Sequence, residues 1–171
     1  MASITLRVNG ASHEVEADPS TPLIFVLRNQ LGLMGAKLGC GLEQCGACAV
    51  LIDDEAVLSC VRAVSEFEGC KILTVEGLAA DGSASDVQSA FIEEGAAQCG
   101  YCTPGMVIAA TALLRRNAAP GEAEIHEALH DHLCRCGSHV RVLRAIGRLV
   151  GGGGHDGAKR ALLSGKTIPV K

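Results

Sequence analysis

Eight of the nine cysteines in this 171-residue chain fall into two groups of four, and no other feature constrains its fold as strongly. The first group has the spacing C-x4-C-x2-C-x11-C, and the second has the form C-x2-C…C-x-C. An odd cysteine count and the lack of a secretion signal near Met1 argue against a disulfide framework. The spacings therefore predict metal ligation. The first quartet is Cys40, Cys45, Cys48 and Cys60, and the second quartet is Cys99, Cys102, Cys134 and Cys136.

The spacing of the first quartet matches the cysteine loop of plant-type [2Fe–2S] ferredoxins, with three thiolates in one short loop and a distant fourth. Each iron needs four sulfur ligands, and because two sulfides are shared, four cysteine thiolates complete the set. Gly39, Gly41 and Gly46 permit positive φ angles and close backbone approach, so N–H groups can point at the sulfurs. Zinc is the alternative, but zinc sites usually consist of two C-x2-4-C pairs. We therefore expect a [2Fe–2S] cluster on the first quartet.

The second quartet is less specific, because C-x2-C with C-x-C suits zinc as well as iron. Each cysteine pair lies between two stretches with helical periodicity. Two helical hairpins packed with their loops at the same end would bring the four thiolates together. Beside a first redox centre, a second [2Fe–2S] cluster would extend a path for electrons, whereas structural zinc would not. We expect the second cluster here.

The pattern of apolar residues predicts an α+β protein with two domains. We expect a ferredoxin-like domain at 1–76, a linker at 77–85, a helical domain at 86–150 and a Gly-rich tail at 151–171.

Strands and tight turns dominate the expected first domain. Pro22 is expected to open a helix that runs to Leu31, with Ser20 or Thr21 as its N-cap. Strands are expected at 4–8, 12–16, 49–52 and 71–75, with turns at Asn9-Gly10 and Asp53-Asp54-Glu55.

Helical periodicity dominates the expected second domain. Thr103 is the expected N-cap of its second helix, with Pro104 at the first helical position, and Ser138 is the expected N-cap of its fourth. The helices are expected at 86–97, 104–117, 122–132 and 140–150.

Composition excludes two classes of partner. The net charge is −4 and aromatic residues are scarce, so the chain lacks the basic, aromatic surface that nucleic acid binding needs. It also lacks an apolar run of the roughly 18 residues that a membrane-spanning helix requires. We expect a cytoplasmic protein that does not insert directly into a membrane; the alternative is membrane association or export through a partner.

Three motifs together resemble a known family. They are GCGLEQCGAC at 39–48, GAAQCGYCTPGM at 95–106 and LCRC at 133–136. In this order they resemble the iron–sulfur subunit of the molybdenum hydroxylases, the xanthine dehydrogenase and aldehyde oxidoreductase family. The resemblance covers nearly the whole chain, from about residue 3 to residue 150.

The resemblance implies a β-grasp ferredoxin domain followed by an all-α four-helix bundle, each with one [2Fe–2S] cluster. It implies a separate large subunit with a molybdopterin cofactor, where substrate is oxidised and water supplies the oxygen. The cluster of the bundle would lie nearest that cofactor, with Gln98 and Cys136 close to the pterin. The implied function is electron transfer to an external acceptor during hydroxylation of a heteroaromatic compound or aldehyde, with no catalytic residue in this chain.

One departure concerns the residues after the second quartet. Gly137-Ser138-His139 stands where many relatives have Thr-Gly-Tyr. This variant resembles the isoquinoline and nicotinate dehydrogenase branch, which implies that the next electron carrier is cytochrome c rather than a flavin subunit. Two other functions are weighed against this one: a free-standing two-cluster electron carrier and a zinc-stabilised structural protein.

Several residues outside the quartets suggest chemistry, but each has a simpler interpretation. We expect Cys70 to be a small buried hydrophobe and the histidines to be surface or interface residues. We expect the arginines of the fourth helix to form a solvated face, and Arg135 to be exposed or to hydrogen-bond near the cluster. The histidines are His126, His130 and His132, and the arginines are Arg141, Arg144 and Arg148.

Overall fold

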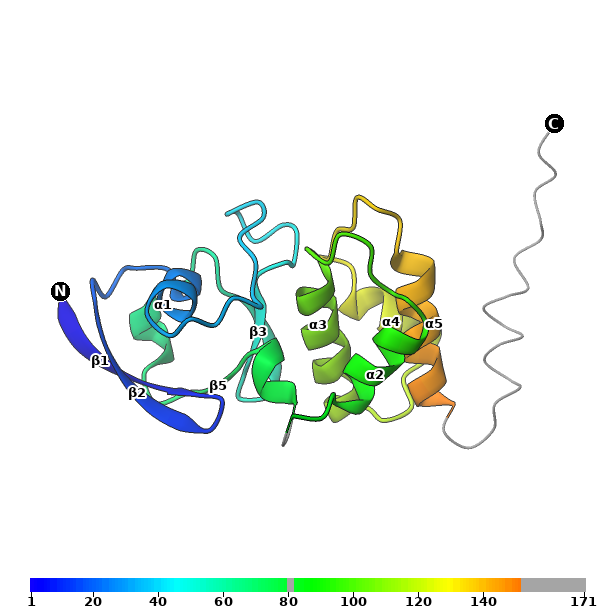
Figure 1. The fold of residues 1–171 in the computed structure, drawn as a ribbon, viewed down its shortest axis with the longest axis horizontal. Helices are drawn as coiled ribbons and strands as arrows, with labels where there is room; N and C mark the ends of the chain where they lie inside the picture. Colours follow the sequence, from blue (N-terminus) through cyan, green and yellow to red (C-terminus); the bar gives the residue numbers. More distant parts are fainter. Residues whose placement is uncertain (80–81, 152–171) are drawn as a thin grey trace.

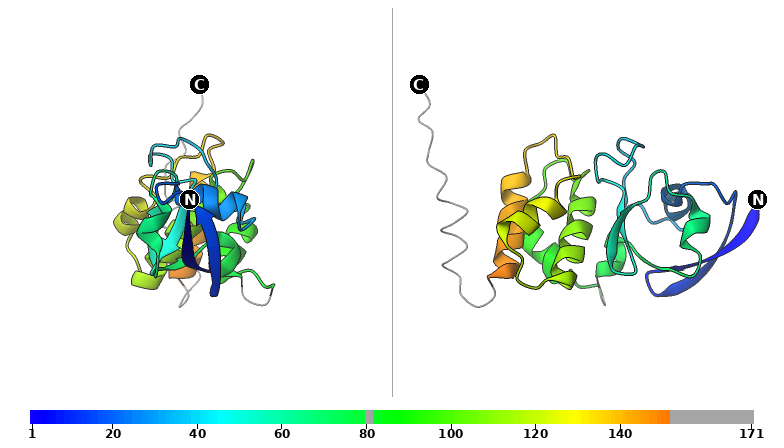
Figure 2. Two further views of the ribbon diagram at one scale, coloured as in Figure 1. Left: turned by 90° about the vertical axis from the view of Figure 1, so that its left-hand side faces the viewer. Right: turned by 180° about the vertical axis from the view of Figure 1, so that it is seen from behind.

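The structure, a computed structural model, describes residues 1–79 and 82–151. A mixed sheet with helix α1 forms one end of an elongated molecule, and helices α2 to α5 form the other (Figure 1). The rear view shows the same two ends with left and right exchanged (Figure 2). The expected α+β class is confirmed. All of the expected tail except Gly151, and part of the expected linker, lie outside the described residues.

The sheet has five strands in the order β2-β1-β5-β3-β4. β1 pairs antiparallel with β2 and parallel with β5, while β3 pairs antiparallel with β4 and β5. Asn9-Gly10 and Asp53-Asp54 adopt positive φ angles, as two-residue hairpin turns require, which confirms both predicted turns. The strand expected at 71–75 ends early because a 3-10 turn begins at Val75. The strands are β1 (Ala2–Val8), β2 (Ala11–Ala17), β3 (Ala49–Ile52), β4 (Glu55–Leu58) and β5 (Lys71–Leu73), and the 3-10 turns are η1 (Val64–Phe67) and η2 (Val75–Leu78).

Helix α1 (Leu23–Asn29) packs against the sheet through its apolar face. The predicted N-cap is wrong: Pro22 is the N-cap, and the Ser20 hydroxyl donates instead to the Asp18 carboxylate at 2.6 Å. The helix also ends before Leu31, because Gly32 follows with a φ of +68° that a helix cannot contain.

The other four helices are α2 (Asp86–Glu93), α3 (Thr103–Arg116), α4 (Glu122–Ala128) and α5 (His139–Val150). The prediction of Thr103 as an N-cap is wrong, because α3 already includes Thr103 and its N-cap is Cys102. Ser138 is the N-cap of α5, as predicted, although its side chain makes no capping hydrogen bond. No helix in the described part of the chain has the length and apolar character needed to cross a membrane.

Helix α3 lies between the sheet and the other helices and is buried along most of its length. Ile108 and Ala112 share an apolar cluster with Ala49 and Leu51 of β3. Another side of α3 joins a second cluster that includes Val142 and Ile146 of α5. Full burial of one such large side chain contributes about 1.5–3 kcal/mol. This packing fixes α3 against β3, and thereby fixes the loops at the ends of both elements.

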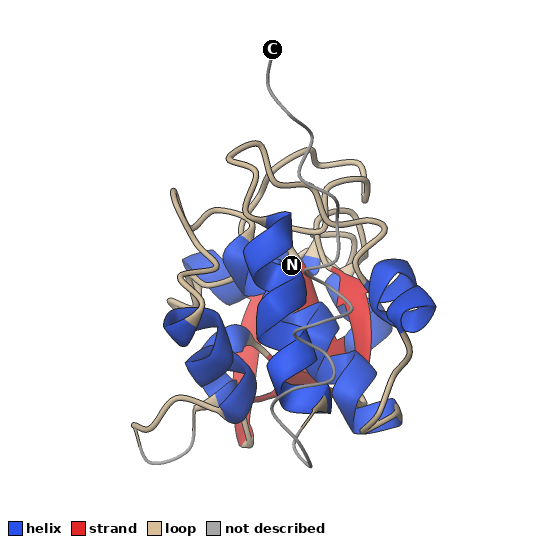
Figure 3. Cartoon of the chain, turned by 90° about the vertical axis from the view of Figure 1, so that its right-hand side faces the viewer, coloured by secondary structure: helices blue, strands red, loops and turns tan. Residues whose placement is uncertain are grey.

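The long loops gather along one edge of the molecule, opposite the turns at the other edge (Figure 3). They are the segments 30–48, 94–102 and 129–138, which lie at the top in Figure 1. All quartet cysteines except Cys60 are on these three loops.

Candidate metal centres

Strand pairing brings Cys60 beside Cys48, at the end of the loop that carries the other cysteines of the first quartet. Cys48 immediately precedes β3, and Cys60 lies two positions after Leu58, the last residue of β4. Because Ala49 pairs with Leu58 in this hairpin, the chain returns Cys60 to the side of Cys48. Both of these cysteines are buried, whereas Cys40 at the far end of the loop is exposed. The sequence separation of Cys60 from Cys48 is therefore set by the length of the β3–β4 hairpin.

Backbone N–H groups point at the sulfurs of the first quartet. The amides of Gln44 and Leu42 donate to the Cys40 Sγ at 3.2 and 3.3 Å, and the Cys40 amide donates to the Cys45 Sγ at 3.4 Å. Burial raises the pKa of Cys40, but the Gln44 and Leu42 amides outweigh it and lower the pKa to about 7. The loop is thus built to stabilise a thiolate.

The glycines of this loop meet two different needs. Gly41 and Gly46 have φ angles of +66° and +71°, which L-residues with side chains rarely adopt. Gly39 instead lacks space, since a Cβ there would lie 2.6 Å from the Cys45 Sγ. Glu43 also has a positive φ, 55°, and nothing in the sequence indicated this. Such strain in a non-glycine residue is typical of a ligand-binding loop.

Cys48 and Cys60 form a pair of adjacent buried thiols. Burial and the neighbouring Cys60 thiol raise the pKa of Cys48 to about 12. Two thiolates cannot coexist here in the absence of a positive charge, because each would repel the other in a medium of low dielectric constant. A cationic metal centre would remove this conflict.

The second quartet lies on the loops that connect two pairs of helices. Cys99 and Cys102 follow α2, Cys134 and Cys136 precede α5, and the Sγ atoms of Cys99 and Cys136 are 3.5 Å apart. Burial and the adjacent Cys134 thiol raise the pKa of Cys102 to about 12. Burial opposes ionisation of Cys134, but hydrogen bonds, including one from the Ser138 amide at 3.5 Å, lower its pKa to about 7. A backbone hydrogen bond from Tyr101 also lowers the pKa of Cys99, so this quartet, like the first, combines stabilised thiolates with suppressed thiols.

Neighbouring sulfurs and backbone N–H donors characterise both quartets. Within residues 1–79 and 82–151, no three Cys, His, Asp or Glu side chains converge as the ligands of a single metal ion would. The sulfurs lie in pairs instead, with backbone donors beside them. Soft thiolates held in this way suit an iron–sulfur cluster, in which two irons and two sulfides separate the cysteine pairs.

Two hydrogen bonds connect the loops of the two quartets. The Leu133 amide donates to the Cys45 carbonyl oxygen at 3.1 Å. The Tyr101 hydroxyl donates to the Leu38 carbonyl oxygen at 2.5 Å. Sequence reasoning did not identify Tyr101, although it stands between two quartet cysteines and is the only tyrosine of the chain.

Gly46 is the point of closest packing between the two loop regions. A Cβ on Gly105, in the first turn of α3, would lie 2.1 Å from the Gly46 carbonyl oxygen. A Cβ on Gly46 would lie 2.3 Å from Nδ1 of His132. Sequence reasoning missed Gly105. The available signal was a glycine inside a predicted helix, since glycine there destabilises the helix by about 1 kcal/mol relative to alanine.

His132 is buried, so the expected surface position is wrong for this histidine, unlike the other two. It is only 6% exposed, and its Nδ1 is buried without a hydrogen-bond partner among the described residues. Burial lowers the pKa of His132 to about 4. By contrast, His126 and His130 are exposed and lie near Glu122 and Asp131, at 3.7 and 3.0 Å.

The remaining residues considered from sequence lie at the surface or near it. The expectation that Cys70 is buried is wrong, since it is partly exposed; what burial it has, followed by the charge of Asp53, raises its pKa. Gln98 and Arg135 are at or near the surface, on the loops of the second quartet. The arginines of α5 are all exposed, as expected for a solvated face; Arg141 also donates to the Gly95 carbonyl oxygen at 3.1 Å, and Arg148 pairs with Glu93 and Glu94.

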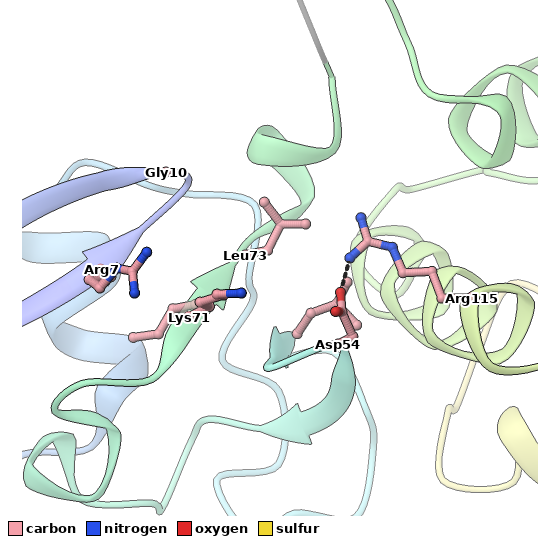
Figure 4. Close-up of a pocket in the computed structure, with 8 residues that line it drawn as sticks. Arg7, Gly10, Asp54, Lys71, Leu73 and Arg115 are labelled. Atoms are coloured by element: carbon pink, nitrogen blue, oxygen red, sulfur yellow. Dashed lines mark hydrogen bonds and ion pairs between the residues drawn. The ribbon is translucent and has the colours of Figure 1, made fainter.

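A hollow of about 200 Å³ lies outside both quartets, between the sheet and α3 (Figure 4). Arg7, Lys71 and Arg115 line it, and Arg115 forms an ion pair with Asp54 at the tip of the β3–β4 hairpin. This pair is exposed, so its net contribution to stability is about 0–1 kcal/mol. It connects α3 to the sheet at the end remote from the cysteines.

Two protein families match parts of the chain that overlap at residues 74–82. The family described as a 2Fe-2S iron-sulfur cluster binding domain matches residues 6–82. The family described as a [2Fe-2S] binding domain matches residues 74–147. Each match contains one complete quartet.

Curated proteins and solved structures are similar over nearly the full length. The chain is 51% identical to a nicotinate dehydrogenase subunit of Pseudomonas putida, covering 85% of this chain and 93% of that protein. It is 39% identical to the nicotinate dehydrogenase small FeS subunit of Eubacterium barkeri, covering 84% and 92%. A chain of quinoline 2-oxidoreductase from Pseudomonas putida superposes with a TM-score of 0.83 at 34% identity, covering 95% of this chain and 98% of that one.

Proposed function

This chain belongs to the family of iron–sulfur subunits of the molybdenum hydroxylases, and we propose that it carries electrons from a molybdopterin site in a large partner subunit to an external acceptor. The observation that carries this proposal is the pair of cysteine quartets held on adjoining loops, one in each of two matched [2Fe–2S]-binding regions. Oxidation of the substrate would occur in the partner, and no residue of this chain is assigned a catalytic role.

The first quartet would hold one [2Fe–2S] cluster and the second quartet the other. When bound, each cluster would accept and release one electron at a time. The two electrons from the oxidation of the substrate could then leave the partner subunit singly. The chain's own residues determine how readily this happens. Amides such as those of Gln44 and Ser138 stabilise sulfur charge, and hydrogen bonds to sulfur are a known determinant of cluster potential.

Gln98 and Cys136 would lie closest to the molybdopterin of the partner. Gln98 is exposed and directly precedes Cys99, whose Sγ is 3.5 Å from that of Cys136. Tyr101 and Leu133 on the same loops are 47% and 62% exposed, which suits a surface covered by another protein chain. These exposed side chains support docking of the large partner at the second quartet.

Two domains would divide these roles: a β-grasp domain at 1–76 and an all-α four-helix bundle at 86–150, joined by a linker at 77–85. Separate apolar clusters support this division, one in the sheet with α1 and one among α2 to α5. The β1–β2 hairpin, the helix α1 and the parallel pairing of β1 with β5 support the β-grasp topology.

The substrate would be a heteroaromatic compound or an aldehyde, since nicotinate and quinoline oxidoreductases are among the similar proteins.

The segment Gly137-Ser138-His139 supports cytochrome c, in preference to a flavin subunit, as the next electron carrier. A cytoplasmic site of assembly is part of the same proposal. The alternative, a free-standing two-cluster carrier, would leave the exposed apolar side chains of the second quartet's loops uncovered.

Expression with the neighbouring genes, followed by purification through this chain, tests the proposal. We expect about four irons per copy of this chain, molybdenum in a large partner that co-purifies, and two distinct [2Fe–2S] EPR signals after dithionite reduction. Two signals with no large partner would favour the free carrier. A colourless, EPR-silent sample containing zinc, prepared anaerobically with iron supplied, would refute electron transfer.

A further inference from the structure

The imidazole of His132 lies between the loops of the two quartets. His132 is two residues before Cys134 of the second quartet, and its ring packs on Gly46, which follows Cys45 of the first. It is 6% exposed. One buried side chain therefore contacts the loop of one quartet while belonging to the loop of the other.

The fit between His132 and Gly46 leaves no free space. A Cβ on Gly46 would lie 2.3 Å from Nδ1 and 2.6 Å from Cγ of the imidazole, and 2.7 Å from the carbonyl oxygen of Asp131. The ring thus fills the volume that any side chain at position 46 would need. Closely packed contacts of this kind resist small displacements, because protein interiors are as dense as molecular crystals.

One side-chain and one backbone hydrogen bond hold the chain in place around His132. The Nε2–H of His139, at the start of α5, donates to the His132 carbonyl oxygen at 3.0 Å. The next amide, that of Leu133, donates to the Cys45 carbonyl oxygen at 3.1 Å. The ring therefore holds Gly46 at a fixed distance from the segment that carries Cys134.

The hydrogen-bonding of the ring does not account for a histidine at this position. Its Nδ1 is buried and has no partner in the described part of the chain, and an unpaired buried polar atom is unfavourable. The imidazole therefore contributes through its shape and its position between the two loops.

We propose that His132 is a positioning residue that fixes the separation of the two clusters and thereby the rate of electron transfer between them. This inference rests on the proposed function, because it requires a cluster on each quartet. His132 is not assigned as a ligand, and it acts through the loops that carry the ligands.

The test compares three variants of the co-expressed complex. His132→Ala removes the ring, and His132→Phe keeps a planar ring without its nitrogens. His130→Ala is the matched control, since His130 is two residues away with a side chain that is 77% exposed. The measurements are iron content, the magnetic interaction between the two reduced clusters in EPR, and the rate of inter-cluster transfer by rapid freezing.

We expect His132→Ala to retain both clusters, to weaken their magnetic interaction and to slow transfer between them, because both quantities fall as the separation of the clusters increases. His132→Phe and His130→Ala should keep the interaction of the unmodified complex.

An unchanged interaction in iron-loaded His132→Ala would overturn the inference, and so would its loss in iron-loaded His132→Phe. If His132→Ala does not retain iron, the Phe variant decides; loss of iron from both would overturn the positioning role and assign His132 to cluster assembly instead. Absence of two clusters from the unmodified complex would overturn the proposed function itself, which keeps the two failures distinct.

Discussion

The amide of Leu133 donates a hydrogen bond to the carbonyl oxygen of Cys45 at 3.1 Å, and this bond joins the two cysteine quartets through the backbone alone. Leu133 directly precedes Cys134 of the second quartet, while Cys45 belongs to the first. No side-chain substitution removes a bond between two backbone groups. The contact is therefore best tested through the side chains and glycines around it.

Tyr101→Phe should loosen the first loop without unfolding the protein. The variant loses the hydrogen bond to the Leu38 carbonyl oxygen, which is worth about 0.5–1.5 kcal/mol. Tyr101 is 47% exposed, so water can replace the lost partner and the cost should fall at the lower end. Hydrogen–deuterium exchange around residues 38–46 should rise a few-fold. Val140→Ala, at an exposed site on α5, should not change that exchange; equal exchange in both variants would contradict the prediction.

Gly46→Ala should be far more harmful than Gly41→Ala. Both glycines have similar positive φ angles, +71° and +66°, so the backbone strain is of the same kind. A Cβ at position 41 meets nothing within 4 Å, whereas one at position 46 meets the His132 ring. We expect Gly41→Ala to cost about 1–2 kcal/mol and to retain iron. Gly46→Ala should also lower the iron content or alter the EPR signals, and similar behaviour of the two would show that packing on His132 is unimportant.

Substitution of one cysteine in each quartet should remove the two clusters independently. Cys60→Ser should lose about half of the iron and one EPR signal, and Cys102→Ser should lose the other half and the other signal. The reason is that each quartet completes one ligand set. Cys70→Ser, outside both quartets, is the control and should retain all the iron. Loss of iron in that control would assign Cys70 a role that its position gives no reason to expect.

After removal of iron, the cysteines should react with an alkylating reagent in an order set by their pKa values. At pH 8 the thiols of Cys40 and Cys134, with pKa values of about 7, are mostly thiolate, and those of Cys48 and Cys102, with pKa values of about 12, stay protonated. Since the thiolate is the reactive form, iodoacetamide should modify the first two before the second two. Mass spectrometry after timed quenching measures this order.

The iron-loaded complex provides the comparison for the same labelling experiment. With the quartets occupied, only Cys70 should react, because metal-bound sulfur is not available to the reagent. Early labelling of Cys48 in the iron-loaded sample would contradict its assignment as a ligand.

Local sequence determined much of this protein. Asn9-Gly10 specified a hairpin because a two-residue turn depends only on the residues within it. The spacing of Cys40, Cys45 and Cys48 pointed to a [2Fe–2S] loop for the same reason, since a short segment must wrap one cluster. The four helices of the second half were located by periodicity, although their ends at Glu93 and Ala128 were not.

Tertiary structure alone decided what holds the two quartets together. The sequence could not show that His132 packs on Gly46, or that Gly105 touches the Gly46 carbonyl oxygen, because these residues are far apart along the chain. Periodicity and spacing describe neighbours within a few positions, and they carry no information on which distant backbones approach each other. Those approaches depend on α3 packing against β3, which fixes the loops at the ends of both elements only when the whole chain has folded.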